Sequence, residues 1–522
     1  MLQMKDLTIT HRKDLRVIIE DFQLVLNEGD KAVMIGEEGN GKSTIMRYLY
    51  NPELVEDYTE CSGERIFGKE TLGYLPQELP ARDQEKTVYE FFSETEFFWN
   101  QSPKDLSKLA KDYQVSGDFF YSEQKMKSLS GGEKVKAQLM KLLMLGPSVL
   151  LLDEPSNDID IATLELIEKL INDWKGIVLF ISHDETLIEK TANMVIHIEQ
   201  IMRKTKSRYT IAHLPYRRYV EERLHQFERQ EQQALNDRRE KQIREEKYRR
   251  LLQKVEHAQA TVSRKEPAVS KNLKDKMHSV KSMGKRFERE DANMTEMPEQ
   301  EEAIFFKLGE KDNFIPAGKT VIEYALPVLK TPADENGDER VLAQNIFLRI
   351  KGSEKICMVG ANGAGKTTLL KKIAAELLER KDIHAEYMPQ NYEELLDMEQ
   401  TPVDFLDTSG DKEERTRIRT YLGSLKYTAD EMDHPIRELS GGQKAKVLLL
   451  KMSLSKANVL ILDEPTRNFS PLSGPVIRQM IREFPGAVIS ISHDRKYVKE
   501  VCDCIYELSL DGLKKVEEEM AI

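Results

Sequence analysis

The chain has 522 residues, of which 40% are hydrophobic and 32% are charged, and its formal net charge is −12. This length and composition indicate a globular protein of two to four domains with ample hydrophobic core. The longest apolar runs, such as 149–152 and Ile177–Ile181, are far shorter than the ~20 residues of a membrane-spanning helix, and the N-terminus lacks an apolar run. We therefore expect a cytoplasmic protein without a secretory signal or a membrane span.

Four cysteines are distributed along the chain without a paired metal-binding pattern, at Cys61, Cys357, Cys502 and Cys504. Only the last two are close in sequence, and a single Cys-x-Cys is a weak metal motif. Reduced thiols are the simplest interpretation, and they agree with a cytoplasmic location.

The first part of the chain, residues 1–210, alternates short apolar runs with amphipathic segments. Apolar runs at Lys31–Ile35, 149–152 and Ile177–Ile181 predict buried parallel strands, with helices between them. Residues 303–522 repeat this plan, and their matching runs are Lys355–Val359, 459–462 and Ala487–Ile491. The alternation predicts two α/β domains, each built on a parallel sheet.

The segment between them, residues 211–302, has a different pattern. Residues 216–262 contain no Gly or Pro after Tyr216, and their apolar residues predict one face of a long helix of roughly 70 Å: Val220, Leu224, Phe227, Leu235, Ile243, Leu251, Val255 and Ala258. After a polar break at 263–267, a second stripe follows: Val269, Leu273, Met277, Val280, Gly284 and Phe287. Pro267 suits the first turn of that helix. We expect an antiparallel helical hairpin and then an acidic tether at 291–302.

This hairpin carries a local positive charge within an acidic protein. Residues 241–290 contain 15 Lys and Arg against 7 Asp and Glu. The charge asymmetry favours a polyanionic partner for the middle segment. A solvated spacer without a partner is the alternative interpretation.

Two segments match the phosphate-loop pattern G-x-x-x-x-G-K-[ST], and each follows an apolar strand and precedes a helical pattern. The glycines let the backbone wrap phosphates, while Lys42 and Lys366 offset the charge of the β and γ phosphates. Ser43 and Thr367 are the expected Mg²⁺ ligands. The predicted binding residues in the two loops are Gly36, Gly39, Asn40, Gly41, Lys42, Ser43 and Thr44, and Gly360, Asn362, Gly363, Ala364, Gly365, Lys366, Thr367 and Thr368.

Two pairs of adjacent acidic residues end predicted strands. Asp153 and Asp463 are placed to hold Mg²⁺ through water. The following residues, Glu154 and Glu464, are placed to orient and polarise an attacking water. We therefore expect two sites that hydrolyse nucleotide.

Further motifs recur in the same order and at constant spacing, which indicates two copies of one domain. Leu-Ser-Gly-Gly-Glu at 129–133 and Leu-Ser-Gly-Gly-Gln at 439–443 lie 310 residues apart, as do Asp153 and Asp463. On these motifs the chain resembles the ATP-binding cassette superfamily, of which Leu-Ser-Gly-Gly-Glu/Gln is the signature. The resemblance implies head-to-tail pairing of the two cassettes within a monomer, with ATP and Mg²⁺ as ligands.

The resemblance also assigns site residues by position. Site one would combine the first phosphate loop with the signature of the second cassette: Ser440, Gly441, Gly442 and Gln443. Site two would combine the second loop with the first signature: Ser130, Gly131, Gly132 and Glu133. Gln77 and Gln390 match the glutamine that senses Mg²⁺ and water, and His183 and His493 match the histidine near the γ-phosphate.

Two departures from the superfamily pattern predict unequal sites. The first half has no aromatic residue before Phe22 to stack on adenine, and His11 is near the expected position, so GTP is a second candidate nucleotide. After the glutamates, the first half has Asp160 where the second half has Ser470. That aspartate couples the two sites in the superfamily.

Two cassettes joined by a basic hairpin resemble the ABC-F proteins, and in particular the bacterial antibiotic-resistance members. This resemblance implies a ribosome-binding ATPase whose linker enters the tRNA exit site of the 70S ribosome, near 23S rRNA and P-site tRNA. It would protect the peptidyl-transferase centre from drugs of the lincosamide, pleuromutilin and streptogramin A kind. A general translation factor is the alternative, followed by a tandem ATPase subunit of a membrane importer and a chromosome-type ATPase.

Overall fold

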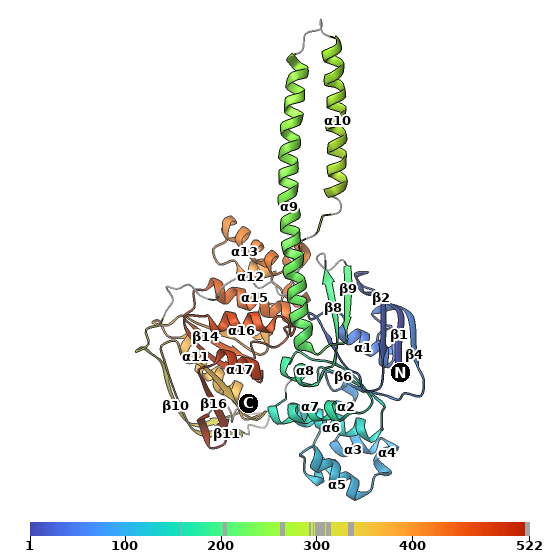
Figure 1. The fold of residues 1–522 in the computed structure, drawn as a ribbon. Coiled ribbons are helices and arrows are strands. Elements are labelled where there is room, and N and C mark those ends of the chain that lie inside the picture. Colours follow the sequence, from blue (N-terminus) through green and yellow to red (C-terminus); the bar gives the residue numbers. More distant parts are fainter. Residues whose placement is uncertain are drawn as a thin grey trace. The chain divides into compact units, whose positions relative to one another are not determined.

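The computed structural model describes residues 1–157, 159–201, 206–261, 267–291, 294–295, 297, 308, 315–331 and 339–516. The chain divides into two compact units. One unit comprises Met1–Tyr216 together with Glu301–Ile522, and the other is Arg217–Gln300. Figure 1 shows both units coloured along the sequence.

The first half is built on a six-stranded sheet in the order β5-β6-β7-β3-β8-β9. Five neighbouring strands pair in parallel and β9 pairs antiparallel with β8. The central strands are apolar along their whole length because both faces of a parallel sheet are covered. The strands are β3 (Lys31–Ile35), β5 (Leu72–Leu75), β6 (Val149–Asp153), β7 (Ile177–Ile181), β8 (Met194–Ile201) and β9 (Lys206–Ala212).

A three-stranded antiparallel sheet, β2-β1-β4, packs its apolar side on the same core. Its strands are β1 (Leu2–His11), β2 (Val17–Leu26) and β4 (Thr59–Phe67). The helices of this half are α1 (Lys42–Tyr50), α2 (Ala81–Gln84), α3 (Val88–Ser93), α4 (Glu96–Trp99), α5 (Pro103–Asp112), α6 (Gly131–Met144), α7 (Ile161–Asp173) and α8 (Glu185–Thr191).

The second half repeats this strand order as β13-β14-β15-β12-β16-β17, so the prediction of two α/β domains is confirmed. Its strands are β12 (Lys355–Val359), β13 (Ala385–Met388), β14 (Val459–Asp463), β15 (Ala487–Ile491), β16 (Cys504–Ser509) and β17 (Gly512–Val516), with a hairpin of β10 (Thr320–Lys330) and β11 (Val341–Lys351). Its helices are α11 (Lys366–Leu378), α12 (Pro402–Leu406), α13 (Lys412–Ser424), α14 (Ala429–Asp433), α15 (Gly441–Leu454), α16 (Gly474–Arg482) and α17 (Arg495–Val501).

The middle unit is the expected pair of long helices, α9 (Tyr216–Thr261) and α10 (Pro267–Asp291), which run antiparallel in Figure 1. Tyr248 of α9 lies over Gly284 of α10, where a Cβ would come within 2.9 Å of the tyrosine hydroxyl. The Tyr248 ring also meets Phe287 edge-on, with 6.4 Å between ring centroids. At the last residue of α10, Asp291 pairs with Arg244 of α9 at 3.2 Å.

Three members of the predicted apolar stripe on α9 are largely exposed, and two of them, Leu224 and Leu235, lie before Lys241, which pairs with the last residue of α10. Leu224, Leu235 and Ile243 are 52%, 51% and 59% exposed. Steps of three and four residues from Tyr248 lead back to Arg244 and Lys241, which pair with Asp291, and forward to Leu251 and Val255 of the predicted stripe, which are half-buried. The predicted break at 263–267 lies outside the described residues except for Pro267, with which α10 begins, and most of the predicted tether lies outside them as well.

Candidate active sites

Each phosphate loop connects the central strand of its sheet to a helix. The loop 36–42 joins β3 to α1, and its counterpart joins β12 to α11. Gly36 has φ 144°, and a Cβ there would lie 2.2 Å from the Ile198 carbonyl oxygen. Gly360 has φ 141° and an equivalent contact of 2.6 Å with the Leu508 carbonyl. Side chains are therefore excluded where the loop passes the sheet.

The loop lysines are folded over their own loops. Lys42 donates to the carbonyl oxygens of Gly36 and Glu37 at 2.8 and 2.9 Å, and Lys366 donates to those of Gly360 and Ala361 at 2.6 and 3.0 Å. Each ammonium group thus lies beside the N-terminus of a helix, where anions are stabilised. Asn40 is buried and braces its loop by donating to the Ile198 carbonyl at 3.0 Å.

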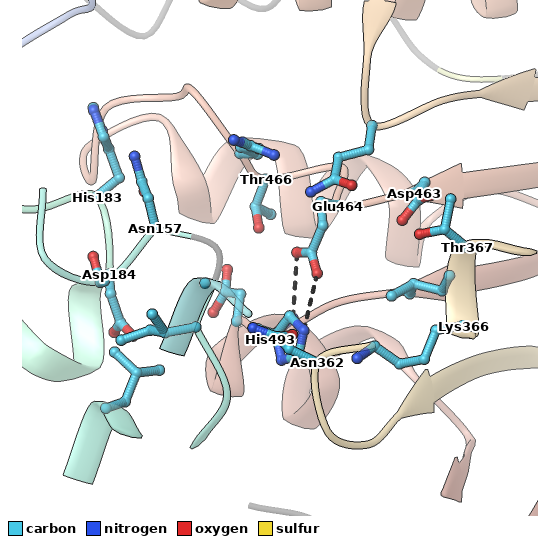
Figure 2. A pocket seen from close by; sticks show the side chains of 18 of the residues that line it. Asn157, His183, Asp184, Asn362, Lys366, Thr367, Asp463, Glu464, Thr466 and His493 are labelled. Carbon is cyan, nitrogen blue, oxygen red and sulfur yellow. Dashed lines mark hydrogen bonds and ion pairs between the residues drawn. The ribbon is translucent and has the colours of Figure 1, made fainter. Parts of the chain in front are cut away.

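Site two is a cavity of about 520 Å³ between the two cassettes. Figure 2 shows side chains of both halves around it. The predicted residues that line it include Ser130, Gly131, His183, Asn362, Gly363, Gly365, Lys366, Thr367, Thr368, Gln390, Asp463, Glu464 and His493. The second phosphate loop therefore faces the first signature.

Asp463 has the environment of a cation ligand. Both carboxylate oxygens are buried, and neither accepts a hydrogen bond of normal geometry from any residue that the structure describes. Burial raises the pKa of Asp463 to about 6, although Thr367 and Lys366 act to lower it. Mg²⁺ is usually bound by one or two protein carboxylates and keeps several water ligands. The carboxylate of Asp463, with the side-chain oxygens of Thr367 and Gln390, fits this requirement. The described residues contain no cluster of three or more His, Cys, Asp or Glu that would suit a protein-only metal cage.

Glu464 and His493 face each other in site two (Figure 2). The His493 backbone N–H donates to Glu464 at 3.3 Å, and the His493 Nε2 lies 3.8 Å from the carboxylate. Burial, together with the charge of Asp463, raises the pKa of Glu464 to about 8. Burial and the nearby Lys366 ammonium lower the pKa of His493 to about 4. At neutral pH both groups are therefore mainly uncharged.

Site one holds the equivalent carboxylate in a different state. Glu154 lies 3.2 Å from His183 Nε2, accepts a hydrogen bond from Gln77 at 3.0 Å and accepts another from Asn157. Burial acts to raise the pKa of Glu154, but His183, Lys42 and Asn157 together outweigh it and lower the pKa to about 2. Glu154 is thus ionised across the physiological range.

The predicted metal ligands of site one already contact each other. Ser43 Oγ donates to Asp153 at 2.8 Å, and the Tyr74 hydroxyl donates to the second Asp153 oxygen at 3.1 Å. Burial raises the pKa of Asp153, while Ser43 opposes that rise. Gln77 is held close to this group by its hydrogen bond to Glu154. Ser43 and Asp153 therefore form an oxygen-rich group that also fits Mg²⁺.

Both signatures begin helices through capping boxes. Ser130 caps α6 with Glu133, and Ser440 caps α15 with Gln443. The side chains of Glu133 and Gln443 are engaged in these caps, so their direct contact with nucleotide remains a prediction. Gly132 and Gly442 lie one residue inside each helix.

The first phosphate loop touches the second signature through two glutamates. Glu38 accepts a hydrogen bond from the Gly442 backbone N–H, and Glu37 pairs with Lys446 of α15 at 3.0 Å. The second loop has Ala361 and Asn362 at the matching positions. An acidic loop against the signature is therefore specific to site one.

Sequence reasoning missed several of these residues. Glu37, Glu38 and Asn157 could have been found by comparing the two repeats position by position. Tyr74 lies three residues before Gln77, and Tyr387 lies three before Gln390, which is a repeated signal. In contrast, the contacts of Lys446 follow only from the tertiary structure.

The departures noted in the sequence have structural counterparts. The negative charge of Asp160, from the first half, acts to raise the pKa of Lys366 and of His493 in site two, against the lowering effect of burial. Ser470, at the matching position, lies instead beside Ser473. His11 contacts Tyr58 at 6.5 Å between ring centroids and Asp14 at 2.7 Å. That the first site accepts GTP as well as ATP stays a prediction.

Comparison with known proteins agrees with this geometry. A family model described as "ABC transporter" matches residues 19–157 and 343–467. The putative ATP-binding protein YdiF of Bacillus subtilis is 26% identical over 99% of this chain and 81% of its own length. The ribosome protection protein VmlR of the same organism is 28% identical over 96% of this chain and 85% of its own.

A solved structure also shares the fold. The archaeal ribosome recycling factor aABCE1, in complex with stalk protein aP1, matches with a TM-score of 0.57 and 17% identity, over 99% of this chain and 91% of its own. At this identity the likeness concerns the fold alone.

The chain therefore belongs to the ABC transporter family, as a tandem of two ATP-binding cassettes. The predicted resemblance to ABC-F proteins is confirmed by relatives such as YdiF and VmlR. The cassette family hydrolyses ATP, so the predicted ATPase activity is confirmed as well. Among the described residues, no helix is both long and apolar enough to cross a membrane.

Proposed function

We propose that this protein is a cytoplasmic ATPase that binds the 70S ribosome through its helical hairpin and protects the peptidyl-transferase centre from antibiotics. The hairpin would enter through the tRNA exit site and lie near 23S rRNA and P-site tRNA. The observation that carries the proposal is the basic hairpin inserted between two cassettes. The similarity to VmlR, a ribosome protection protein, supports it.

The charge of the hairpin is available to a partner. Lys and Arg side chains on both helices are exposed, and they include Arg249, Arg250, Lys254, Lys271, Lys274, Lys276, Lys281, Lys285 and Arg286. Such side chains neutralise RNA phosphates and release counterions, and so their binding weakens steeply as salt rises. A two-helix arm of this length suits a narrow path lined with phosphates better than a flat protein surface.

The two sites would convert ATP into opening and closing of the cassettes. Lys42 and Lys366 would neutralise the phosphates, while each signature helix would present its N-terminal N–H groups from the opposite cassette. Ser43 with Asp153, and Thr367 with Asp463, would hold Mg²⁺, which supplies charge stabilisation to the transferring phosphoryl group. Glu154 and Glu464 would orient water, and His183 and His493 would position those carboxylates.

The second candidate is a general translation factor that acts without a drug. The identities to VmlR and to YdiF differ little, so similarity alone does not favour drug protection over this role. The two functions differ in their effect on the bound ribosome. A protection protein raises drug tolerance of a susceptible host, whereas a translation factor changes tRNA-dependent steps in drug-free extracts.

The test combines ribosome sedimentation with growth. The variant carrying Glu154→Gln and Glu464→Gln should pellet with ribosomes in ATP at low salt, and should dissociate as salt rises. In the same background, Lys274, Lys276, Lys281 and Lys285 changed to Gln should reduce binding and flatten the salt dependence. A matched control changes three exposed apolar residues of α9, Leu224, Leu235 and Ile243, to Gln.

Growth then separates the two candidates. Expression of the unaltered protein should raise the tolerated concentration of lincosamides, pleuromutilins or streptogramin A, and the double Glu→Gln variant should not. Ribosome binding without any change in tolerance would support the translation factor. Absence of ATP-dependent pelleting would overturn both.

A further inference from the structure

Four charged residues at the contact between the cassettes are buried, and their charges are exchanged between the repeats. The first cassette contributes Glu168 of α7 and Glu185 of α8, which are 7% and 6% exposed. The second contributes Arg478 of α16 and Arg495 of α17, which are 3% and 4% exposed. We call these four residues the exchanged-charge interface.

The repeat relates these residues in pairs. Glu168 and Arg478 are 310 residues apart, and so are Glu185 and Arg495, which is the spacing that separates His183 from His493. Each position is therefore acidic in the first cassette and basic in the second. Two copies of one ancestral domain would have had the same residue at both.

The pairs cross between the cassettes. Arg478 makes a two-pronged contact with Glu185, at 2.9 and 3.2 Å. Arg495 donates to Glu168 and lies 3.6 Å from Asp184. Lys496 adds a bond to Glu185 at 2.8 Å. A pseudo-twofold relation thus places position 185 against 478, and position 495 against 168.

The neighbours inside each cassette are exchanged as well. Glu168 accepts a bond from Lys190 at 3.0 Å, and Arg478 donates to Glu500 at 2.6 Å. Lys190 and Glu500 are again 310 residues apart. Gly474 leaves space for this network, since a Cβ there would lie 2.5 Å from a Glu185 oxygen.

The exchange sets opposite charges against each other when a first cassette meets a second cassette. Two first cassettes meeting in this geometry would bring Glu185 against Glu168, and two second cassettes would bring Arg495 against Arg478. Buried like charges cost far more than exposed ones, because little water screens them. Specific interfaces commonly reject wrong partners by this means.

We propose that the exchanged-charge interface selects the partner of each cassette, so that a first cassette pairs only with a second cassette and like pairs are rejected. The interface lies at the nucleotide site, since Glu185, Arg478 and Gly474 line the same cavity as Lys366 and His493. ATP-driven closure and partner choice therefore use one surface.

The test uses full-length protein in the Glu154→Gln and Glu464→Gln background. Variant one carries Glu168→Arg with Lys190→Glu, which keeps the internal ion pair in reversed form but sets the introduced arginine against Arg495. Variant two carries Arg495→Glu, which sets a glutamate against Glu168. Variant three combines all three changes and restores opposite charges across the interface. A neutral variant, Glu168→Gln with Arg495→Gln, removes charge without repulsion.

The readout is the ATP concentration that half-compacts the protein, measured by small-angle X-ray scattering. Variants one and two should require roughly 30-fold more ATP or fail to compact. The neutral variant should lie between them and the parent, and variant three should recover part of the parent's response, because Asp184 still lies beside the introduced glutamate. Thermal unfolding of each variant reports whether it is folded. If the Arg495→Glu variant does not fold, the neutral variant still tests the contribution of the buried charges.

Two results would overturn the proposal. One is parental compaction by variants one and two, which would mean that the buried charges do not select. The other is a failure of variant three to exceed variants one and two, which would mean that charge opposition is not what the surface recognises.

Discussion

The two nucleotide sites are built from the same motifs yet differ in charge. Site one has an ionised Glu154 paired with His183 and an acidic loop against the signature, whereas site two has a mainly neutral Glu464 and an uncharged Asn362. The catalytic carboxylates are the same residue type, and the differences come from the side chains around them and from the variable positions of the phosphate loop. Identical catalytic residues in a repeat therefore do not make equivalent sites.

The largest expected effect is on turnover at pH 7. Glu154→Gln should reduce ATP hydrolysis by roughly tenfold, because it removes the ionised carboxylate of site one and leaves only site two, where about a tenth of Glu464 is ionised at pH 7. Glu464→Gln should reduce it by less than about threefold, since Glu464 is mostly protonated at that pH. Steady-state phosphate release measures both, and equal losses would contradict the inequality of the sites.

The pH profiles of these variants sharpen the same comparison. With Glu154→Gln only site two remains, and its rate should rise roughly tenfold per pH unit up to about pH 8, because the ionised fraction of Glu464 rises until its raised pKa is passed. With Glu464→Gln the remaining rate should lack this rise, because Glu154, with a pKa of about 2, is ionised throughout. Two superimposable profiles between about pH 6 and 9 would disprove the assignment.

Exchanging one loop residue should make site one resemble site two. Glu38→Asn removes a carboxylate that competes with phosphate for the Gly442 N–H, so nucleotide affinity of site one should rise by about tenfold. The reverse change, Asn362→Glu, should weaken site two by a similar factor. Titration with a fluorescent ATP analogue in single-site backgrounds measures both, and an unchanged affinity for Glu38→Asn would argue against competition.

The smallest expected effect concerns the two tyrosines behind the metal ligands. Tyr74→Phe removes the hydrogen bond to Asp153 and should weaken Mg²⁺ binding at site one by roughly threefold to tenfold. Tyr387→Phe is the matched control, since the Tyr387 hydroxyl is buried and makes no hydrogen bond within the described part of the chain. The dependence of ATP hydrolysis on Mg²⁺ concentration, measured for both variants, reports the difference. The same Mg²⁺ dependence in both variants would mean that Tyr74 has no role.

Much of the molecule could be predicted from residues close together in sequence. The phosphate loops, the signatures capped by Ser130 and Ser440, and the buried strands are local patterns, and the repeat confirmed each by a second occurrence. The helical hairpin also followed from composition and periodicity. The helix contact was predicted in part: Gly284 and Phe287 of the predicted stripe meet Tyr248 of α9. Tyr248 and Arg244 were outside the predicted stripe of α9, because the pattern counted only apolar residues.

By itself, the sequence determined that two ATP-hydrolysing cassettes flank a basic hairpin, because contiguous motifs and local periodicity encode those features. Only the tertiary structure decided that Glu154 and Glu464 differ in charge state, that Glu38 meets Gly442 and that Glu185 meets Arg478. Burial and electrostatic interaction depend on distances between groups hundreds of residues apart, and those distances exist only once the chain has folded.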